Sequence, residues 1–95
     1  MNIAFETWKG RALATLSSIR SELQNPGPEL LEDIKRLEWW IPRLRLEDLP
    51  VFDEIVRELS RRYASEKLLS LLPTEEERSK IRDESIERML FRVGD

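Results

Sequence analysis

The chain has 95 residues, the size of one domain, and a net charge of −3. It contains no Cys and no His, which excludes disulfides, Cys/His zinc sites and histidine acid–base catalysis. The acidic balance argues against tight non-specific binding to duplex nucleic acid, because such binding requires several phosphates to be neutralised. Leu, Glu and Arg dominate, and since these residues favour helices we expect a single all-α domain over residues 1–95.

The composition also indicates a source organism type and a cellular location. Arg outnumbers Lys twelve to four, while Asn, Gln and Met occur two, one and two times. Few thermolabile residues beside many ion-pairing ones are typical of a thermophile, although a GC-rich genome would favour Arg equally. Residues 1–16 lack the pattern of a signal peptide, and no stretch is apolar enough for a membrane span, so we expect a cytoplasmic protein.

Helical spacing of apolar residues predicts a first helix over about residues 2–24, with Asn2 as its N-cap. The predicted core stripe of this helix consists of Phe5, Trp8, Ala12, Leu16, Ile19 and Leu23. Gly10 interrupts the helix, and we interpret it as a point of close helix packing. The sequence NPGP at residues 25–28 ends the helix.

A second helix is predicted over residues 28–40, with Pro28 at its first position and Pro42 beyond its end. Its core stripe consists of Leu30, Ile34, Leu37 and Ile41. Residues 43–47 alternate charged and apolar side chains. We expect an extended connector there, with both of its leucines tucked into the core.

A third helix is predicted over residues 49–72 and a fourth over 75–93, where Thr74 and Glu77 match a capping box. The third helix keeps one apolar stripe as far as Tyr63. Four later apolar residues, Ala64, Leu68, Leu71 and Leu72, lie away from that stripe. Either the helix breaks near Ser65, or its second half packs against something else. The expected fold is a small four-helix bundle, with five segments if the break occurs.

Some apolar residues miss the core stripe of their own helix. At 100° per residue, Trp39 lies opposite Leu30 and Trp40 lies on the shoulder of the stripe. A small bundle that buries both faces of its helices would explain this, and so would docking onto a partner. Trp and Arg are enriched at binding hot spots. The candidate partner-binding residues are Trp39, Trp40, Arg43, Arg45, Leu68, Leu72 and Phe91.

Nucleic acid is a second possible partner. The best basic cluster, comprising Arg57, Arg61, Arg62 and Lys67, could contact phosphates. The same arginines could instead pair with the acidic residues interleaved among them. The aromatic–basic run at residues 39–45 could also stack on single-stranded bases.

Catalytic and metal-binding patterns are weak. Two E-x-x-E pairs, Glu29 with Glu32 and Glu84 with Glu87, could hold Mg²⁺ if they faced each other, but a chain with 19 acidic residues produces such pairs by chance. No nucleophile motif occurs. We therefore predict no catalytic residue, metal, cofactor, small-molecule substrate or membrane partner. The leading hypothesis is a non-enzymatic interaction module that dimerises or serves as an accessory subunit, and the alternative is a nucleic-acid-associated accessory factor.

Overall fold

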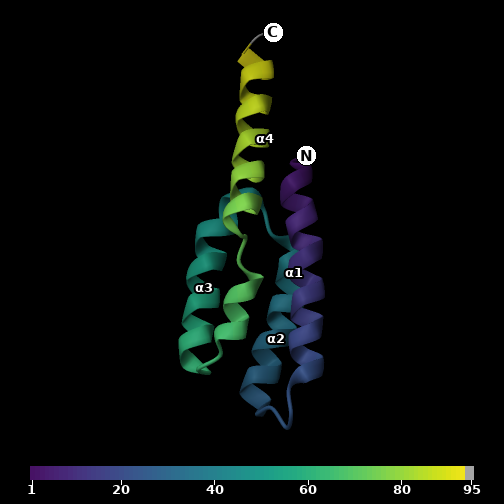
Figure 1. The fold of residues 1–95 in the computed structure, drawn as a ribbon, viewed down its shortest axis with the longest axis vertical. Coiled ribbons are helices and arrows are strands. Elements are labelled where there is room, and N and C mark those ends of the chain that lie inside the picture. The colour runs from purple at the N-terminus through teal and green to yellow at the C-terminus, as the bar shows by residue number, and fades with distance from the viewer. Residues whose placement is uncertain (94–95) are drawn as a thin grey trace.

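The computed structural model describes the backbone of residues 1–93 and the side chains of residues 1–90, and this part of the chain is an all-helical fold without strands (Figure 1). Its α-helices are α1 (Ile3–Glu22), α2 (Pro28–Trp40), α3 (Leu49–Arg62) and α4 (Glu75–Val93). Three 3-10 segments connect them: η1 (Ile41–Arg43), η2 (Leu46–Asp48) and η3 (Glu66–Leu71). The predicted all-α fold is confirmed. Of the two alternatives for the third helix, the structure shows the one in which the helix breaks near Ser65.

One apolar core joins all of these helices. Trp8 is fully buried at its centre, and its ring meets Phe52 of α3 edge-on at 5.4 Å between centroids. Ile34 contributes from α2 and Ile81 from α4. The buried stripe of α1 contains Phe5, Trp8, Ala12, Leu16 and Ile19, as predicted. Leu23, at the end of that stripe, is only half-buried.

Gly10 lies on the solvent side of α1. A Cβ built at this position would meet no atom within 4 Å. The expectation of close helix packing at Gly10 is therefore wrong, because no neighbouring helix approaches that face.

The connector between α2 and α3 is extended only at Leu44 and Arg45. It forms the two short turns η1 and η2, and only one of its leucines, Leu44, is buried between them. Leu46 is 38% exposed, so the expectation that both leucines enter the core is wrong for this residue. The ammonium group of Lys9 donates to the carbonyl oxygen of Leu44 at 3.1 Å and pairs with Glu6 at the same distance. This contact fixes the connector to α1.

The third predicted helix, residues 49–72, is wrong beyond residue 62. Ala64 adopts a left-handed conformation with φ of 48°, which ends α3 and reverses the chain. The turn is closed by Ser65, whose amide donates to the carbonyl oxygen of Ser60 at 2.9 Å, while the Ser60 hydroxyl donates to the Ser65 carbonyl oxygen at 2.8 Å. As a result η3 runs back between α3 and α1 (Figure 1).

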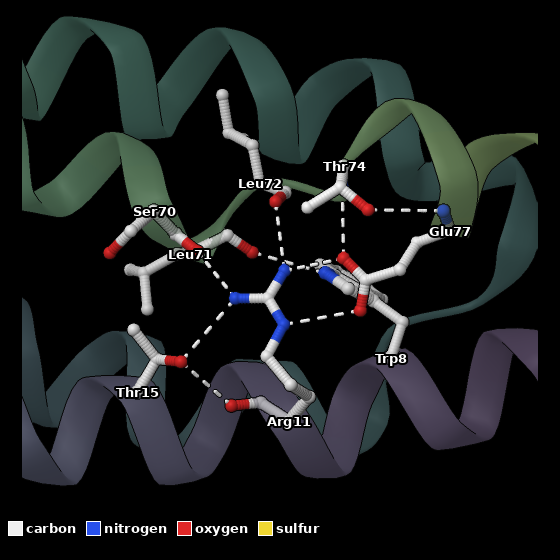
Figure 2. A network of polar contacts seen from close by, with 8 residues as sticks. All are labelled: Trp8, Arg11, Thr15, Ser70, Leu71, Leu72, Thr74 and Glu77. Carbon is white, nitrogen blue, oxygen red and sulfur yellow. Dashed lines mark hydrogen bonds and ion pairs between the residues drawn. The ribbon is translucent and has the colours of Figure 1, made fainter.

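A polar clamp holds the segment that joins η3 to α4 against α1 (Figure 2). Arg11 donates to the carbonyl oxygens of Ser70 and Leu72, the second at 3.0 Å, and pairs with Glu77 at 2.6 Å. The indole N–H of Trp8 donates to the Leu71 carbonyl oxygen at 3.0 Å. These donors satisfy carbonyl groups that would otherwise be left unpaired near the core.

The capping box predicted at the start of α4 is confirmed (Figure 2). The Thr74 hydroxyl accepts from the Glu77 amide at 3.1 Å, and the Glu77 carboxylate accepts from the Thr74 amide at 2.9 Å. Glu77 therefore caps its own helix and holds Arg11 with the same carboxylate.

The molecule is elongated, measuring 56 × 20 × 20 Å, because the end of α4 extends beyond the start of α1 (Figure 1). The last hydrogen bonds that join the start of α1 to α4 within residues 1–90 are made by Asn2, which donates to Ser85 at 3.0 Å, and by Glu84, which accepts from the amides of Ile3 and Ala4 at 2.5 and 2.8 Å. These amide donors lower the pKa of Glu84. Beyond this point α4 stands free of α1.

Candidate functional site

An open, largely apolar groove lies between α2 and α3, which run antiparallel to each other (Figure 1). The core packing of α2 is made mainly with α1, and this leaves α2 and α3 apart. The groove encloses about 640 Å³. Its apolar lining consists of Leu37, Trp39, Trp40, Ile55 and Leu59, and we call it the α2/α3 groove.

Trp39 forms the outer wall of this groove and is 61% exposed. The guanidinium carbon of Arg43 lies 4.4 Å from the centroid of its ring. Arg43 also donates to the Trp39 carbonyl oxygen at 2.6 Å, which satisfies one of the free carbonyl groups at the end of α2. The hydrogen bond positions the guanidinium beside the indole, and the cation–π contact favours this orientation of the ring, which otherwise stays mostly exposed.

Trp40 and Ile55 form the rest of the apolar surface. Trp40 is half-buried and its ring packs on Phe52 at 5.4 Å, so it links the groove to the core. Ile55 projects from α3 and is 39% exposed. Ile55 was not among the predicted site residues. It lies about 60° from Phe52 around the helix, on the shoulder of the core stripe, which is the position that singled out Trp40 on the second helix.

Charged side chains of α2 form the rim of the groove. They are Glu32, Asp33, Lys35 and Arg36. Arg36 pairs with Asp33 at 3.3 Å. Lys35 makes no ion pair within residues 1–90. The rim therefore carries both signs of charge, with one cation left unpaired among the described side chains.

A hydrogen bond crosses from α3 to α2 at one end of the groove. The Tyr63 hydroxyl donates to Asp33 at 2.5 Å, and this bond raises the pKa of Tyr63. The contact ties the two helices together near the end of α3. The groove thus runs from Trp39, near the end of α2, to the contact between Tyr63 and Asp33 in the first half of that helix.

Two of the predicted partner-binding residues lie elsewhere. Leu68 and Leu72 are 1% and 8% exposed and belong to the core, because the break at Ala64 turns them inward. Their assignment to a partner surface is therefore wrong. The side chain of Phe91 lies outside the described residues.

Arg45 is exposed but occupied by its own segment. It pairs with Glu47 at 2.9 Å and with Asp48 at 3.3 Å, and the hydrogen bond to Asp48 is the main reason its pKa is raised. The Arg45 backbone amide also donates to Asp48, and this is the largest cause of the lowered pKa of that carboxyl. Arg45 thus closes the η2 turn and does not line the groove.

The predicted basic cluster is not assembled into one free surface. Arg57 pairs with Asp53 at 2.6 Å, Arg61 with Glu58 at 2.8 Å, and Lys67 with Glu22 of α1 at 3.0 Å. Arg62 lines a separate shallow hollow beside Tyr63. For Arg57 and Arg61 the arrangement matches the interpretation of these residues as ion-pairing partners of their acidic neighbours.

The two predicted E-x-x-E pairs are not brought together. Glu29 is in the first turn of α2, at the opposite end of the molecule from the projecting part of α4 (Figure 1). Glu84 is engaged with the first amides of α1. Among the described residues no three acidic side chains lie close enough together to hold a metal ion.

No helix in the described part of the chain has the length and apolarity needed to cross a membrane. No family model, curated protein or solved structure matches this chain.

Proposed function

We propose that this chain is a non-enzymatic protein-interaction module that binds an apolar helical segment of a protein in the α2/α3 groove. The observation that carries the proposal is Trp39, an exposed indole that Arg43 holds in place beside an apolar groove. Trp and Arg are the residue types most often found at binding hot spots. A groove between two helices is the usual receptor for an amphipathic helix.

The charged residues near the groove favour a protein partner over a nucleic acid. A nucleic-acid surface needs free cations for phosphates. Here Arg45, Arg57 and Arg61 are each paired with a carboxylate of the same chain. An accessory subunit of a larger assembly, or a self-associating protein, remains the role we propose.

The test compares three forms of the protein as baits in extract of the source cells. Wild type and Leu69→Glu should capture the same stoichiometric protein, because Leu69 is 37% exposed in η3 and does not line the groove. Ile55→Glu should lose it, because a carboxylate would be desolvated in an apolar contact. The captured protein is then purified and its affinity for each form is measured by titration.

Two outcomes would overturn the proposal. Equal affinity of wild type and Ile55→Glu for the purified partner would place binding elsewhere. Loss of all capture after nuclease treatment would favour the nucleic-acid alternative, and the next substitutions would be Arg43→Ala and Arg45→Ala.

We also infer a thermophilic source and a cytoplasmic location from the composition. Ion pairs that arginines make between different helices, such as Arg11–Glu77 and Arg78–Asp53, support the inference of a thermophilic source. We expect a melting temperature above the roughly 45–65 °C typical of mesophilic domains. A value inside that range, measured by circular dichroism, would favour the GC-rich genome as the origin of the Arg bias.

A further inference from the structure

The fold leaves a second apolar surface besides the groove, on the projecting end of α4. We call residues 83–90 the α4 tail. We propose that the α4 tail of one copy of this chain binds in the α2/α3 groove of a second copy. The inference rests on the proposed function of the groove as a receptor for a helix, and it names the occupant.

The α4 tail carries an apolar ridge that its own chain does not cover. Ile86, Met89 and Leu90 are 48%, 66% and 66% exposed. Their i, i+3, i+4 spacing places them on one face of the helix. Ile81, which is buried, lies about 140° around the helix from Ile86. Because α1 packs on the side of Ile81, the ridge faces away from α1.

The spacing and length of the ridge suit the groove. Helices that bind in grooves present anchors at i, i+3, i+4 and i+7, and Ile86, Met89 and Leu90 supply the first three. The eight residues of the tail span about 12 Å at 1.5 Å per residue. Helix α2 lines the groove from Glu32 to Trp40, a length of about 14 Å, so the tail matches the length of the groove.

The charges of the two surfaces are complementary. Asp83 and Glu87 are exposed and lie four residues apart beside Leu90, on one side of the ridge. Asp83 lies 3.9 Å from Arg82, so Glu87 is the acid of this flank that is free to pair with a partner. The rim of the groove on α2 carries Lys35 and Arg36 beside Glu32 and Asp33, and Arg36 is paired with Asp33. Neither Glu87 nor Lys35 makes an ion pair within residues 1–90. A tail in the groove would allow these two side chains to neutralise each other.

Pairing of two tails with each other fits the charges less well. An antiparallel two-fold pair brings the same flank of both helices together, so Asp83 and Glu87 of one copy would face the same acids of the other. Like charges placed together are unfavourable. The groove offers an apolar floor and, on a rim of mixed charge, the unpaired cation Lys35.

The test is a complementation experiment followed by sedimentation velocity over a range of concentrations. Leu90→Glu damages the ridge and leaves the groove intact, whereas Ile55→Glu damages the groove and leaves the ridge intact. We expect each variant alone to be a monomer of 11.3 kDa, and wild type and the Leu69→Glu control to associate. An equimolar mixture of the two damaged variants should form a complex of twice the monomer mass, because one intact ridge meets one intact groove.

A charge exchange guards against variants that fail to fold, since it alters only exposed side chains. Lys35→Glu and Glu87→Lys should each weaken self-association severalfold, and the double variant should restore it. Circular dichroism verifies that all variants keep the wild-type helix content. No restoration in the double variant would contradict the proposed register of the tail.

Three results would overturn the inference. One is a wild-type protein that stays monomeric at the highest attainable concentration. The second is association of Ile55→Glu alone, which would indicate pairing of two tails. The third is a mixture that remains monomeric. None of these results contradicts the proposal that the groove binds a different protein. The capture experiment tests that proposal separately, because Leu90→Glu should capture the partner as wild type does, whereas Ile55→Glu should not.

Discussion

Arg11 and Glu77 face each other through two hydrogen bonds, from Nε to Oε2 at 3.1 Å and from Nη2 to Oε1 at 2.6 Å. The pair joins α1 to the first turn of α4, 66 residues further along the chain. Because Arg11 also donates to the carbonyl oxygens of Ser70 and Leu72, one side chain fixes the whole segment between η3 and α4 (Figure 2). The direction in which the α4 tail projects depends on this clamp.

Replacing Arg11 by Met should therefore destabilise the fold. The substitution removes the Arg11 donor from the carbonyl groups of Ser70 and Leu72 and leaves Glu77 with only the Thr74 amide. We expect the free energy of unfolding to fall by about 1–3 kcal/mol. Urea denaturation measures the change. The control is Arg20→Met, which removes an exposed pair with Glu38 at 2.8 Å and should cost under about 1 kcal/mol. Equal losses in the two variants would mean that the clamp contributes no more than a surface ion pair.

The same pair makes stability depend on pH. Burial alone would raise the pKa of Glu77, but hydrogen bonds from Arg11 and Thr74 outweigh it and lower the pKa below its ordinary value of 4.5. A carboxyl whose pKa is lowered in the folded state stabilises the protein fully above pH 4.5, the ordinary pKa of Glu. This contribution is lost as the pH falls through the lowered pKa of the folded state. Glu77→Gln should thus melt below wild type at neutral pH, and the difference should shrink in acid.

Thermal melts from neutral pH down to about pH 3 measure this effect. The matched control is Glu76→Gln, one residue away, whose side chain is 78% exposed and pairs only with Lys80 at 3.2 Å. It should follow the wild-type profile. A Glu77→Gln variant whose deficit stayed constant over the whole range would show that the charge of Glu77 is not what stabilises the clamp.

The end of α3 offers a stabilising substitution. Ala64 has φ of 48°, where a Cβ crowds the backbone, whereas Gly adopts this conformation without strain. We expect Ala64→Gly to raise the free energy of unfolding by up to about 1 kcal/mol after the greater freedom of Gly in the unfolded chain is subtracted. The control, Ala14→Gly in the middle of α1, should lower it by about 1 kcal/mol. Loss of stability at both sites would contradict the left-handed turn.

Gly10 offers the opposite exchange. It lies within α1, and a side chain added there meets no atom within 4 Å. Gly10→Ala should therefore stabilise the protein by roughly 0.5–1 kcal/mol through helix propensity alone. Chemical denaturation measures the gain. A destabilised variant would indicate that another chain packs against this face.

The sequence predicts helices well where one apolar stripe continues along a single face. The stripe of α1 and the limits of α2 follow from spacing and from Pro28, because burial of one helix face is a local pattern. The break at Ala64 has no such local signal, since neither Gly nor Pro occurs there. Only the displaced leucines that follow it indicate a turn of the chain.

Contacts between distant residues account for the rest. At 100° per residue Trp39 lies opposite the core stripe of its helix, and in the structure it is exposed to solvent. Leu68 and Leu72 lie equally far from the stripe, yet the turn buries them. Periodicity shows that a side chain leaves the stripe of its helix, but whether it then meets solvent or another segment depends on where the chain reverses.

The clearest test of the candidate site compares two tryptophans. Trp8 is fully buried and donates to Leu71, so Trp8→Ala should cost about 3–5 kcal/mol. Trp39 is mostly exposed, and Trp39→Ala should cost less than about 1 kcal/mol, chiefly the cation–π contact with Arg43. Acrylamide quenches the fluorescence of exposed tryptophans. In the monomeric Leu90→Glu background, Trp39→Ala should therefore also remove most of the tryptophan fluorescence that acrylamide quenches. If Trp39→Ala proved as costly as Trp8→Ala in that background, Trp39 would belong to the core of the monomer, and the groove would lose the residue on which its proposed function depends.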